Sequence, residues 1–279
     1  MLDLLARLMK EEPEKYATFW KVFGAVLKEG IAQDHANQPA ILPLLRFAST
    51  SAEGDAPTVS LADYVVRMKP GQERIYYVIA ESSAAARASP AIERLKERGI
   101  EVLLLADRID EWVMGHIESY EGKRFKDATR GDLELGGLAS DADRKQRDEE
   151  LKESKGLLKR IKDALGERVS EVRLSERLRE SPAVLVIGEH DLSEPMRRIL
   201  AAAGQKVPES RPLLEVNVTH PLVRYLEGRT DTGEFEELAQ LLYDQAALAE
   251  GAPLANAPDY VQRLNRLLVR LAAPPGAAS

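Results

Sequence analysis

Apolar residues recur at three- and four-residue steps near the start of the chain, which is the period of helices with one buried face. A first helix is expected from residue 2 onward, with no capping residue before it. A second stripe at 16–27 is typical of a core-facing helix, and Gly30 is placed to end it. A further helix is expected at about 37–47, followed by a polar loop at 49–57.

The period then changes, because short runs that are apolar throughout predict strands covered on both faces. Residues 75–80 and 100–105 form two such runs. A helical segment at 82–98 joins them, with a break expected at Pro90 and an end at Gly99. A strand, a helix and a strand with short links form a βαβ unit, so the two strands should be parallel.

Residues 108–120 predict one more helix, after which the charges alternate in sign as in a solvated connecting helix. We therefore expect two consecutive domains of mixed helix and sheet, an α/β (α+β) fold, at 1–140 and 141–279. The first domain should contain helices within 1–48 and a small α/β subdomain at 58–130.

The second half repeats the pattern of strands and helices. Strands are predicted at 183–187 and 213–218, with a helix at 192–203 between them. Two apolar helices, at 234–250 and 258–271, follow near the end of the chain. The solvated connecting helix is expected to precede the strands and helices of this half. The last residues, 273–279, are expected to form a disordered tail.

Composition narrows the possible functions. The chain has 279 residues, with 46 acidic and 39 basic side chains and a net charge of −7, which argues against a dedicated nucleic-acid binder. It has no cysteine, so neither a thiolate metal site nor a disulfide can form. No run approaches the ~18 apolar residues of a membrane span, so we expect no membrane partner. The lack of cysteine fits a reducing, intracellular environment, and we expect a cytoplasmic location.

Motifs for catalysis are missing from the sequence. It has no phosphate-binding loop, no dinucleotide fingerprint, no HExxH and no nucleophile elbow, and its four histidines lack ligand spacing. We therefore predict no catalytic residue, no metal ligand and no enzyme activity. A small-molecule enzyme remains an alternative, with its pocket at the carboxyl ends of 75–80 and 100–105.

Two helical regions have the pattern of binding surfaces. The helix at 192–203 carries an apolar stripe that is either core or an exposed docking face: Leu192, Met196, Ile199 and Leu200. The last two helices either pack back on their own domain or pair with a second copy in a four-helix bundle. The candidate interface residues are Phe235, Leu238, Leu241, Leu242, Leu264, Leu267, Leu268 and Leu271.

Several segments together resemble the ninety-kilodalton heat-shock chaperones, most closely their bacterial members. Four stretches resemble the later part of the family's middle domain: FWKVFGAVLKEG, LLRFAST, SLADYVVRMKPGQERIYYVIAES and GIEVLLLADRIDEW. Two resemble its C-terminal dimerisation domain: LGERVSEVRLSERLRESPAVLV and MRRILAAAGQKVPESRPLLEVNVTHPLV. The match spans nearly the whole chain.

The resemblance implies a fragment of an ATP-dependent chaperone of the stress response that dimerises and binds unfolded clients. The ATPase domain, with its ATP and Mg, would belong to the parent protein, and the uncapped first helix would be a cut within the middle domain. A partnership with the seventy-kilodalton chaperone system is also implied. A purely structural dimer scaffold is a further alternative.

Residue roles carry over at a few positions only. Trp112 matches a client-contacting tryptophan of the family, with Glu111 before it. Gly115 stands where a polar side chain is expected. The stripe that begins at Leu192 matches the family's client-contacting amphipathic helix, and the last two helices match its dimerisation bundle.

Overall fold

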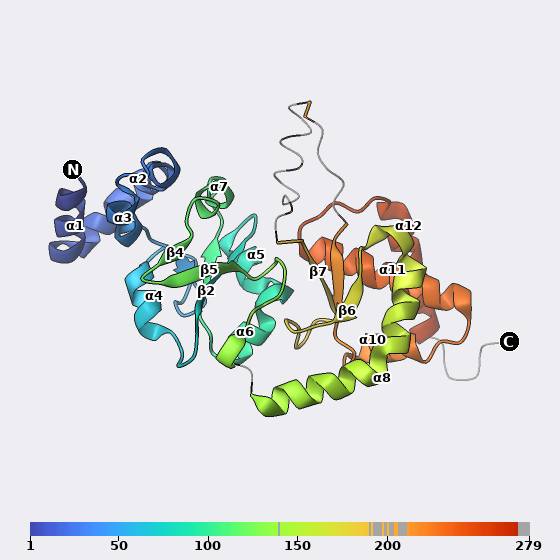
Figure 1. Ribbon diagram of the computed structural model, residues 1–279. Coiled ribbons are helices and arrows are strands. Elements are labelled where there is room, and N and C mark those ends of the chain that lie inside the picture. Colours follow the sequence, from blue (N-terminus) through green and yellow to red (C-terminus); the bar gives the residue numbers. More distant parts are fainter. Residues whose placement is uncertain are drawn as a thin grey trace. The chain divides into compact units, whose positions relative to one another are not determined.

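The chain forms two compact units, each with its own sheet (Figure 1). The structure is a computed structural model that describes residues 1–138, 140–189, 191, 197, 200, 204–205 and 211–272. Unit 1 comprises Met1–Ala128 and Asp132–Ser140, and unit 2 comprises Thr129–Gly131 and Asp141–Ser279. The mixed α/β class expected from the sequence is confirmed.

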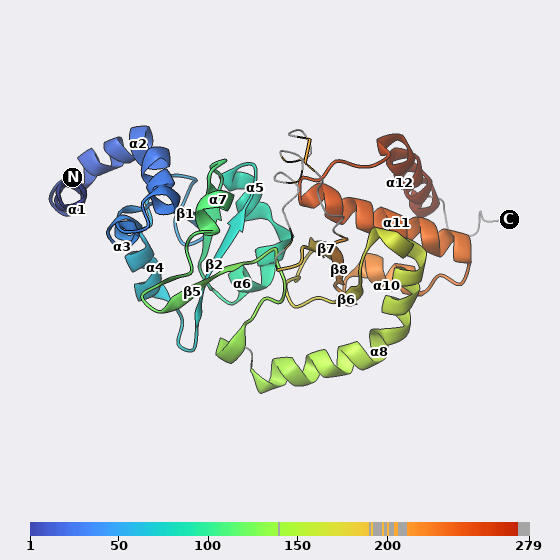
Figure 2. The same cartoon turned by 45° about the horizontal axis from the view of Figure 1, so that its top comes forward.

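Unit 1 consists of short helices around one sheet. Its α-helices are α1 Leu2–Glu11, α2 Pro13–Gln33, α3 Gln38–Ile41, α4 Leu61–Arg67, α5 Ser83–Ala88, α6 Glu93–Glu97 and α7 Asp110–Met114. Its 3-10 turns are η1 Leu42–Leu44, η2 Pro90–Ile92 and η3 Gly136–Leu138. Its strands are β1 Ala48–Ser49, β2 Arg74–Ile79, β3 Val102–Leu105, β4 Ser119–Tyr120 and β5 Lys123–Asp127. Figure 2 shows α1, α2 and α3 gathered at the amino-terminal end of this unit.

The sheet of unit 1 has the order β1-β3-β2-β5-β4. Its three middle strands are parallel, with Tyr77 opposite Leu103 in the β2–β3 pair, and both edge strands are antiparallel. The parallel βαβ unit predicted from the two apolar runs is therefore confirmed. Because side chains alternate along a strand, β2 and β3 each contribute to two cores. Ile75 packs with α2, α4 and α7 on one face, and Tyr76 packs with α5 and α6 on the other.

Four sequence predictions fail within unit 1. The helix expected to end at Gly30 continues to Gln33 in α2. The helix expected at 37–47 ends early, because Pro43 lies in the η1 turn and Phe47 pairs with Val59 across two backbone hydrogen bonds of 2.9 and 3.0 Å. The helix expected at 108–120 is only the five residues of α7, and strands follow it. The stripe at 16–27 is not wholly core-facing, as the next subsection describes.

Unit 2 places helices against one face of a small sheet. Its α-helices are α8 Asp141–Leu165, α10 Pro221–Glu227, α11 Thr232–Ala249 and α12 Ala257–Ala272, with the 3-10 turn η4 Gly166–Arg168 after α8. Its strands are β6 Val172–Leu174, β7 Ala183–Val186 and β8 Leu213–Val216, in the order β6-β8-β7. Strand β8 runs parallel to β6 and antiparallel to β7.

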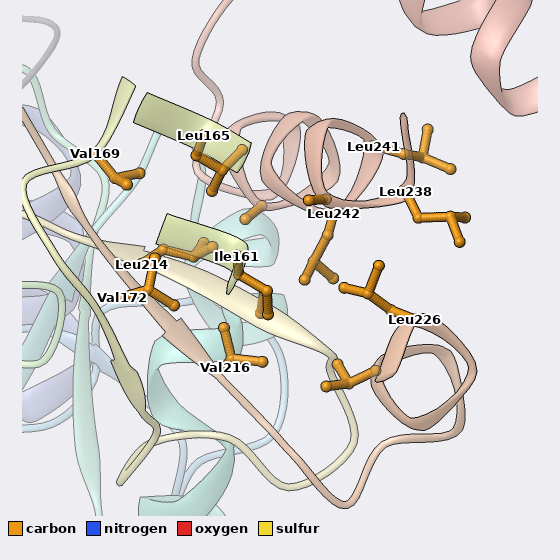
Figure 3. Packing of buried hydrophobic residues seen from close by; sticks show 14 of the residues in the cluster. Ile161, Leu165, Val169, Val172, Leu214, Val216, Leu226, Leu238, Leu241 and Leu242 are labelled. Atoms are coloured by element: carbon orange, nitrogen blue, oxygen red, sulfur yellow. The ribbon is translucent and has the colours of Figure 1, made fainter. Parts of the chain in front are cut away.

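The core of unit 2 lies between β8 and the helices. Figure 3 shows Leu214 and Val216 of the sheet near Ile161 of α8 and Leu242 of α11, and all four side chains are buried. The amino-terminal half of α8 contributes little to this core, since its first buried residue is Ser154. That half is highly charged, which agrees with the solvated connecting helix predicted from the sequence.

The opposite face of this sheet holds a fully buried charge. Glu215 alternates with Leu214 and Val216, so it faces away from the helices, and its side chain has no exposed surface. Arg177, equally buried, donates to Glu215 and to the carbonyls of Arg130 and Gly131. Arg173 donates to the same carboxylate at 2.9 Å.

This ion pair fixes the segment Thr129–Gly131 in unit 2. The segment follows β5 of unit 1 directly in the sequence, but it lies beside the end of β7. The amide of Ile187 donates to the carbonyl of Thr129 at 3.1 Å, and the amide of Gly131 donates to the carbonyl of Ile187 at 2.9 Å. The arginine therefore satisfies two buried groups at once, a carboxylate and a turn of backbone carbonyls.

We predict that Arg177→Met strongly destabilises unit 2. The substitution leaves Glu215 buried with fewer partners, and breaking a buried pair in this way costs about 3–5 kcal/mol. Native-state hydrogen exchange of the β8 amides should show this loss of free energy of opening. Arg211→Met is the matched control, because Arg211 forms an exposed pair with Glu167. Unchanged protection of β8 in Arg177→Met would contradict the prediction.

Candidate functional site

Trp112 is an exposed tryptophan on a short helix whose other side is buried. Val113 and Met114 of α7 lie in the core of unit 1, whereas the Trp112 side chain is 39% exposed. Glu111 beside it is half-buried. The helix thus holds one large aromatic ring at the surface while its neighbours Val113 and Met114 anchor it in the core.

Two histidines extend the surface around Trp112. The ring of His116 packs edge-on against Trp112, with centroids 5.1 Å apart, and its Nδ1 lies 2.8 Å from the Trp112 carbonyl oxygen. The ring of His35, from the loop after α2, lies 5.9 Å from that of His116. Sequence spacing gave no sign of this pair, because the two histidines are far apart along the chain.

Gly115 provides no side chain at the surface next to Trp112. It is exposed, and its φ of −64° is ordinary helical backbone that any residue can adopt. A Cβ built there would lie 3.4 Å from the Trp112 carbonyl oxygen, which is an ordinary contact. The backbone therefore does not demand glycine, and the missing side chain is a difference in the surface rather than in the fold.

Helix α7 is held at its amino-terminal end by a buried ion pair. Lys28 of α2 is 5% exposed, and its Nζ lies 2.6 Å from a carboxylate oxygen of Asp110 and 2.6 Å from one of Asp107. Burial raises the pKa of Asp110 above its ordinary value, and the charge and hydrogen bond of Lys28 oppose that shift. The lysine is the counter-charge of this buried carboxylate.

The carboxyl-terminal end of α7 has a second tie. The Nε2 group of Gln38, in α3, donates to the His116 carbonyl at 2.7 Å and to the Ile31 carbonyl at 3.3 Å. Ile31 is on α2 and has no exposed surface. Both ends of α7 are thus tied to the segment formed by α2 and α3.

Part of α2 carries apolar side chains into solvent. Tyr16 and Trp20 of the predicted stripe are buried, but Phe23 and Val26 are exposed, so the expectation of a wholly core-facing stripe is wrong for these two. Phe23 stacks on Phe19 at 5.4 Å. The periodicity could not reveal this, because α2 has apolar residues on two faces and unit 1 covers one of them.

The predicted docking stripe falls mostly outside the described residues. Leu192, Met196 and Ile199 lie outside them, and the structure adds nothing about their surroundings. Leu200 is described, is helical and is half-buried. Whether this stripe is core or an exposed face stays a prediction.

The terminal helices bury most of the predicted interface residues in their own chain. Phe235, Leu238, Leu241 and Leu242 of α11 lie in the core of unit 2, as does Leu267 of α12, with Leu264 packed partly against it. For Leu271 only the backbone is described. Leu268 differs, because its side chain is 53% exposed.

Helix α12 therefore has three distinct faces. Tyr260, Leu264 and Leu267 face the core, while a row of arginines faces acidic residues of α11. Arg263 pairs with Asp244 at 2.6 Å and Arg266 with Glu237 at 2.7 Å. The third face is exposed and carries three apolar side chains, Val261, Leu268 and Val269, together with Asn265.

The described part of the chain contains no group of three or more His, Asp or Glu side chains that could hold a metal ion. None of its helices is long and apolar enough to cross a membrane. A hollow of about 350 Å³ lies between α11 and α12, lined mainly by charged and amide side chains such as Glu236, Gln240 and Arg263. It is not at the carboxyl ends of β2 and β3, where the enzyme alternative placed its pocket.

A comparison with protein families gives one further finding. The family model described as "Hsp90 protein" matches residues 1–273. The match therefore includes both units, the helix that carries Trp112 and the two terminal helices.

Proposed function

We propose that this chain, which belongs to the Hsp90 family, provides the dimerisation and the client binding of a bacterial-type (HtpG) chaperone and holds unfolded proteins without hydrolysing ATP. Residues 1–140 would be the later part of the middle domain and 141–279 the C-terminal dimerisation domain. Their division into two compact units supports this assignment. We place the protein in the cytoplasm, with the seventy-kilodalton chaperone system as a partner.

Exposed Trp112 is the observation that carries the client-binding proposal. An unfolded client presents many apolar side chains in no fixed geometry, and an exposed aromatic ring can contact them without demanding a sequence. The buried side of α7 keeps the ring in place, so little conformational entropy is lost when a client binds. Glu111 and the stripe that begins at Leu192 would add to this surface.

Dimerisation would strengthen client binding by a surface that binds only weakly on its own. Two copies of the same surface on one frame raise the effective concentration of the second contact, so a flexible client that is bound once is quickly bound twice. The exposed apolar side chains of α12 support the dimer, because each keeps half or more of its surface exposed in the single chain. We place Leu268 at the centre of that interface, with Val261 and Val269 beside it.

The other predicted interface residues would support the exposed face of α12 without forming part of it. Phe235, Leu238, Leu241, Leu242 and Leu267 support α11 and α12 from the core of unit 2. A charge at Leu242 would therefore unfold the protomer as well as any dimer, and Leu268 is the better probe.

ATP chemistry belongs to the parent protein in this proposal. The roles proposed for Trp112 and for the exposed face of α12 need no nucleotide. Passive holding is the activity that the two apolar surfaces can perform. A purely structural scaffold would keep the dimer but would not need Trp112 at the surface.

We predict that Trp112→Ala weakens client binding about tenfold, which corresponds to ~1.4 kcal/mol of lost contact. Fluorescence anisotropy of labelled, reduced and carboxymethylated lactalbumin, which stays unfolded, would measure the affinity. The melting temperature should change little, because Trp112 is exposed. Val66→Ala is the control, since Val66 is an exposed apolar residue of the same unit on α4. Equal losses in both variants, or none in Trp112→Ala, would count against the proposal.

We predict that Leu268→Glu converts a dimer into a monomer. The charge would be buried in an apolar seam, while the exposed position in the single chain keeps the protomer folded. Sedimentation equilibrium should give about twice 30.9 kDa for the unchanged chain and 30.9 kDa for the variant. Leu151→Glu, on the solvated half of α8, should remain dimeric. A Leu268→Glu variant that stays dimeric would refute this interface.

A further inference from the structure

We propose that Lys28 and Asp110 are positioning residues that hold the tryptophan of α7 at the surface in one orientation. The inference rests on the proposed function, because it concerns the same client-contacting ring. It assigns a role in client binding to a lysine that lies 84 residues before Trp112 and does not touch it.

The pair is built as an interior anchor rather than as a surface salt bridge. Asp110 is 1% exposed and is the first residue of α7. One of its carboxylate oxygens accepts from Lys28 at 2.6 Å, and the other accepts from the backbone amide of Asp107 at 2.9 Å. Both oxygens are therefore used, one to reach α2 and one to close the turn that starts α7.

Helix α7 needs such an anchor because it is too short to hold its own geometry. Five residues make little more than one turn, and isolated helices of that length are not stable in water. Ile109, at the capping position, makes no side-chain hydrogen bond to the helix. The Lys28 ammonium and the amide of Asp107 supply, through Asp110, the hold that a capping side chain would otherwise give.

The pair acts on Trp112 through the helix, not by contact. Two residues along an α-helix correspond to a rotation of about 200°, so Trp112 and Asp110 point to nearly opposite sides. The ion pair faces the core between α2 and α7, and the tryptophan faces solvent. A shift of α7 at its first residue therefore rotates or tilts the exposed ring.

Among the described residues, Lys28 has no close charged partner besides two aspartates. Its Nζ contacts Asp110 and Asp107, and the ring of Phe47 lies 5.7 Å away. Burying a lysine and an aspartate together adds little stability compared with apolar residues of the same size. What such a pair does provide is a single geometry, which fits a helix whose task is to present one ring.

The test is Lys28→Met in the full chain, with two readouts. Acrylamide quenching reports mainly Trp112, because the other tryptophan of the chain, Trp20, is buried. Affinity for carboxymethylated lactalbumin reports the function. We expect altered quenching of Trp112 together with a loss of affinity of about fivefold, the size of a moderate contact residue. Wild-type quenching and affinity in Lys28→Met would overturn the proposal.

Two further variants separate positioning from stability. Lys21→Met removes an exposed lysine from the same helix and should change neither readout. Lys28→Met with Asp110→Asn removes the uncompensated buried charge, so the protein should fold even where the single variant does not. The proposal requires altered Trp112 quenching and weak binding in this double variant as well. Recovery of both readouts would overturn it and leave the pair a role in stability alone.

The failure of the proposed function would look different. If Trp112→Ala binds the client normally, the client role of Trp112 is wrong. The quenching experiment still decides whether Lys28 and Asp110 set the orientation of the ring, because it needs no client.

Discussion

The carboxylate of Glu215 lies wholly buried in the middle strand of the second sheet, and the arrangement of unit 2 depends on how it is neutralised. Arg177 meets it from a loop and extends to the backbone carbonyls of Arg130 and Gly131. A charge in such a place is costly unless it is both paired and hydrogen-bonded. The pairing therefore requires that residues 129–131 leave the sheet of unit 1, which they follow in sequence, and pack in unit 2.

Unit 1 has the same kind of constraint on a smaller scale. The buried charges there are Lys28 and Asp110, and they fix the position of α7. The ion pair of unit 2 fixes the segment at 129–131 instead. In each unit an ion pair ties a short segment to an element that lies far away in the sequence. The pair contributes geometry, while the apolar clusters around it contribute most of the stability.

The sequence predicted elements that carry their own signal. The runs that became β2 and β3 are apolar throughout, and the break at Pro90 follows from a residue that cannot continue a helix. Strand β5, which reads Lys-Arg-Phe-Lys-Asp, has no such signal and exists because β2 pairs with it. Helix α4 was missed although Ser60 and Asp63 form a capping box at its start, a signal that the sequence does contain.

The candidate site was predictable only in part, because some of its residues also lack a local sequence signal. Trp112 and Glu111 came from a resemblance in local sequence. Lys28 sits in a helix where its neighbours suggest a solvated side chain, and nothing local indicates a partner 82 residues away. Likewise, the two apolar faces of α2 look alike in sequence, and only the packing of unit 1 shows that Trp20 is covered and Phe23 is not.

Exposed apolar residues stay exposed only if the elements that carry them cannot turn inward. In α12, the arginines at 263, 266 and 270 bind acidic residues of α11, so a rotation that buried Leu268 would break several ion pairs. In α7, burial of Trp112 would pull Asp110 away from Lys28 and leave the buried Asp110 carboxylate without its counter-charge. The charged contacts behind each surface thus oppose its collapse, so the apolar side chains stay exposed.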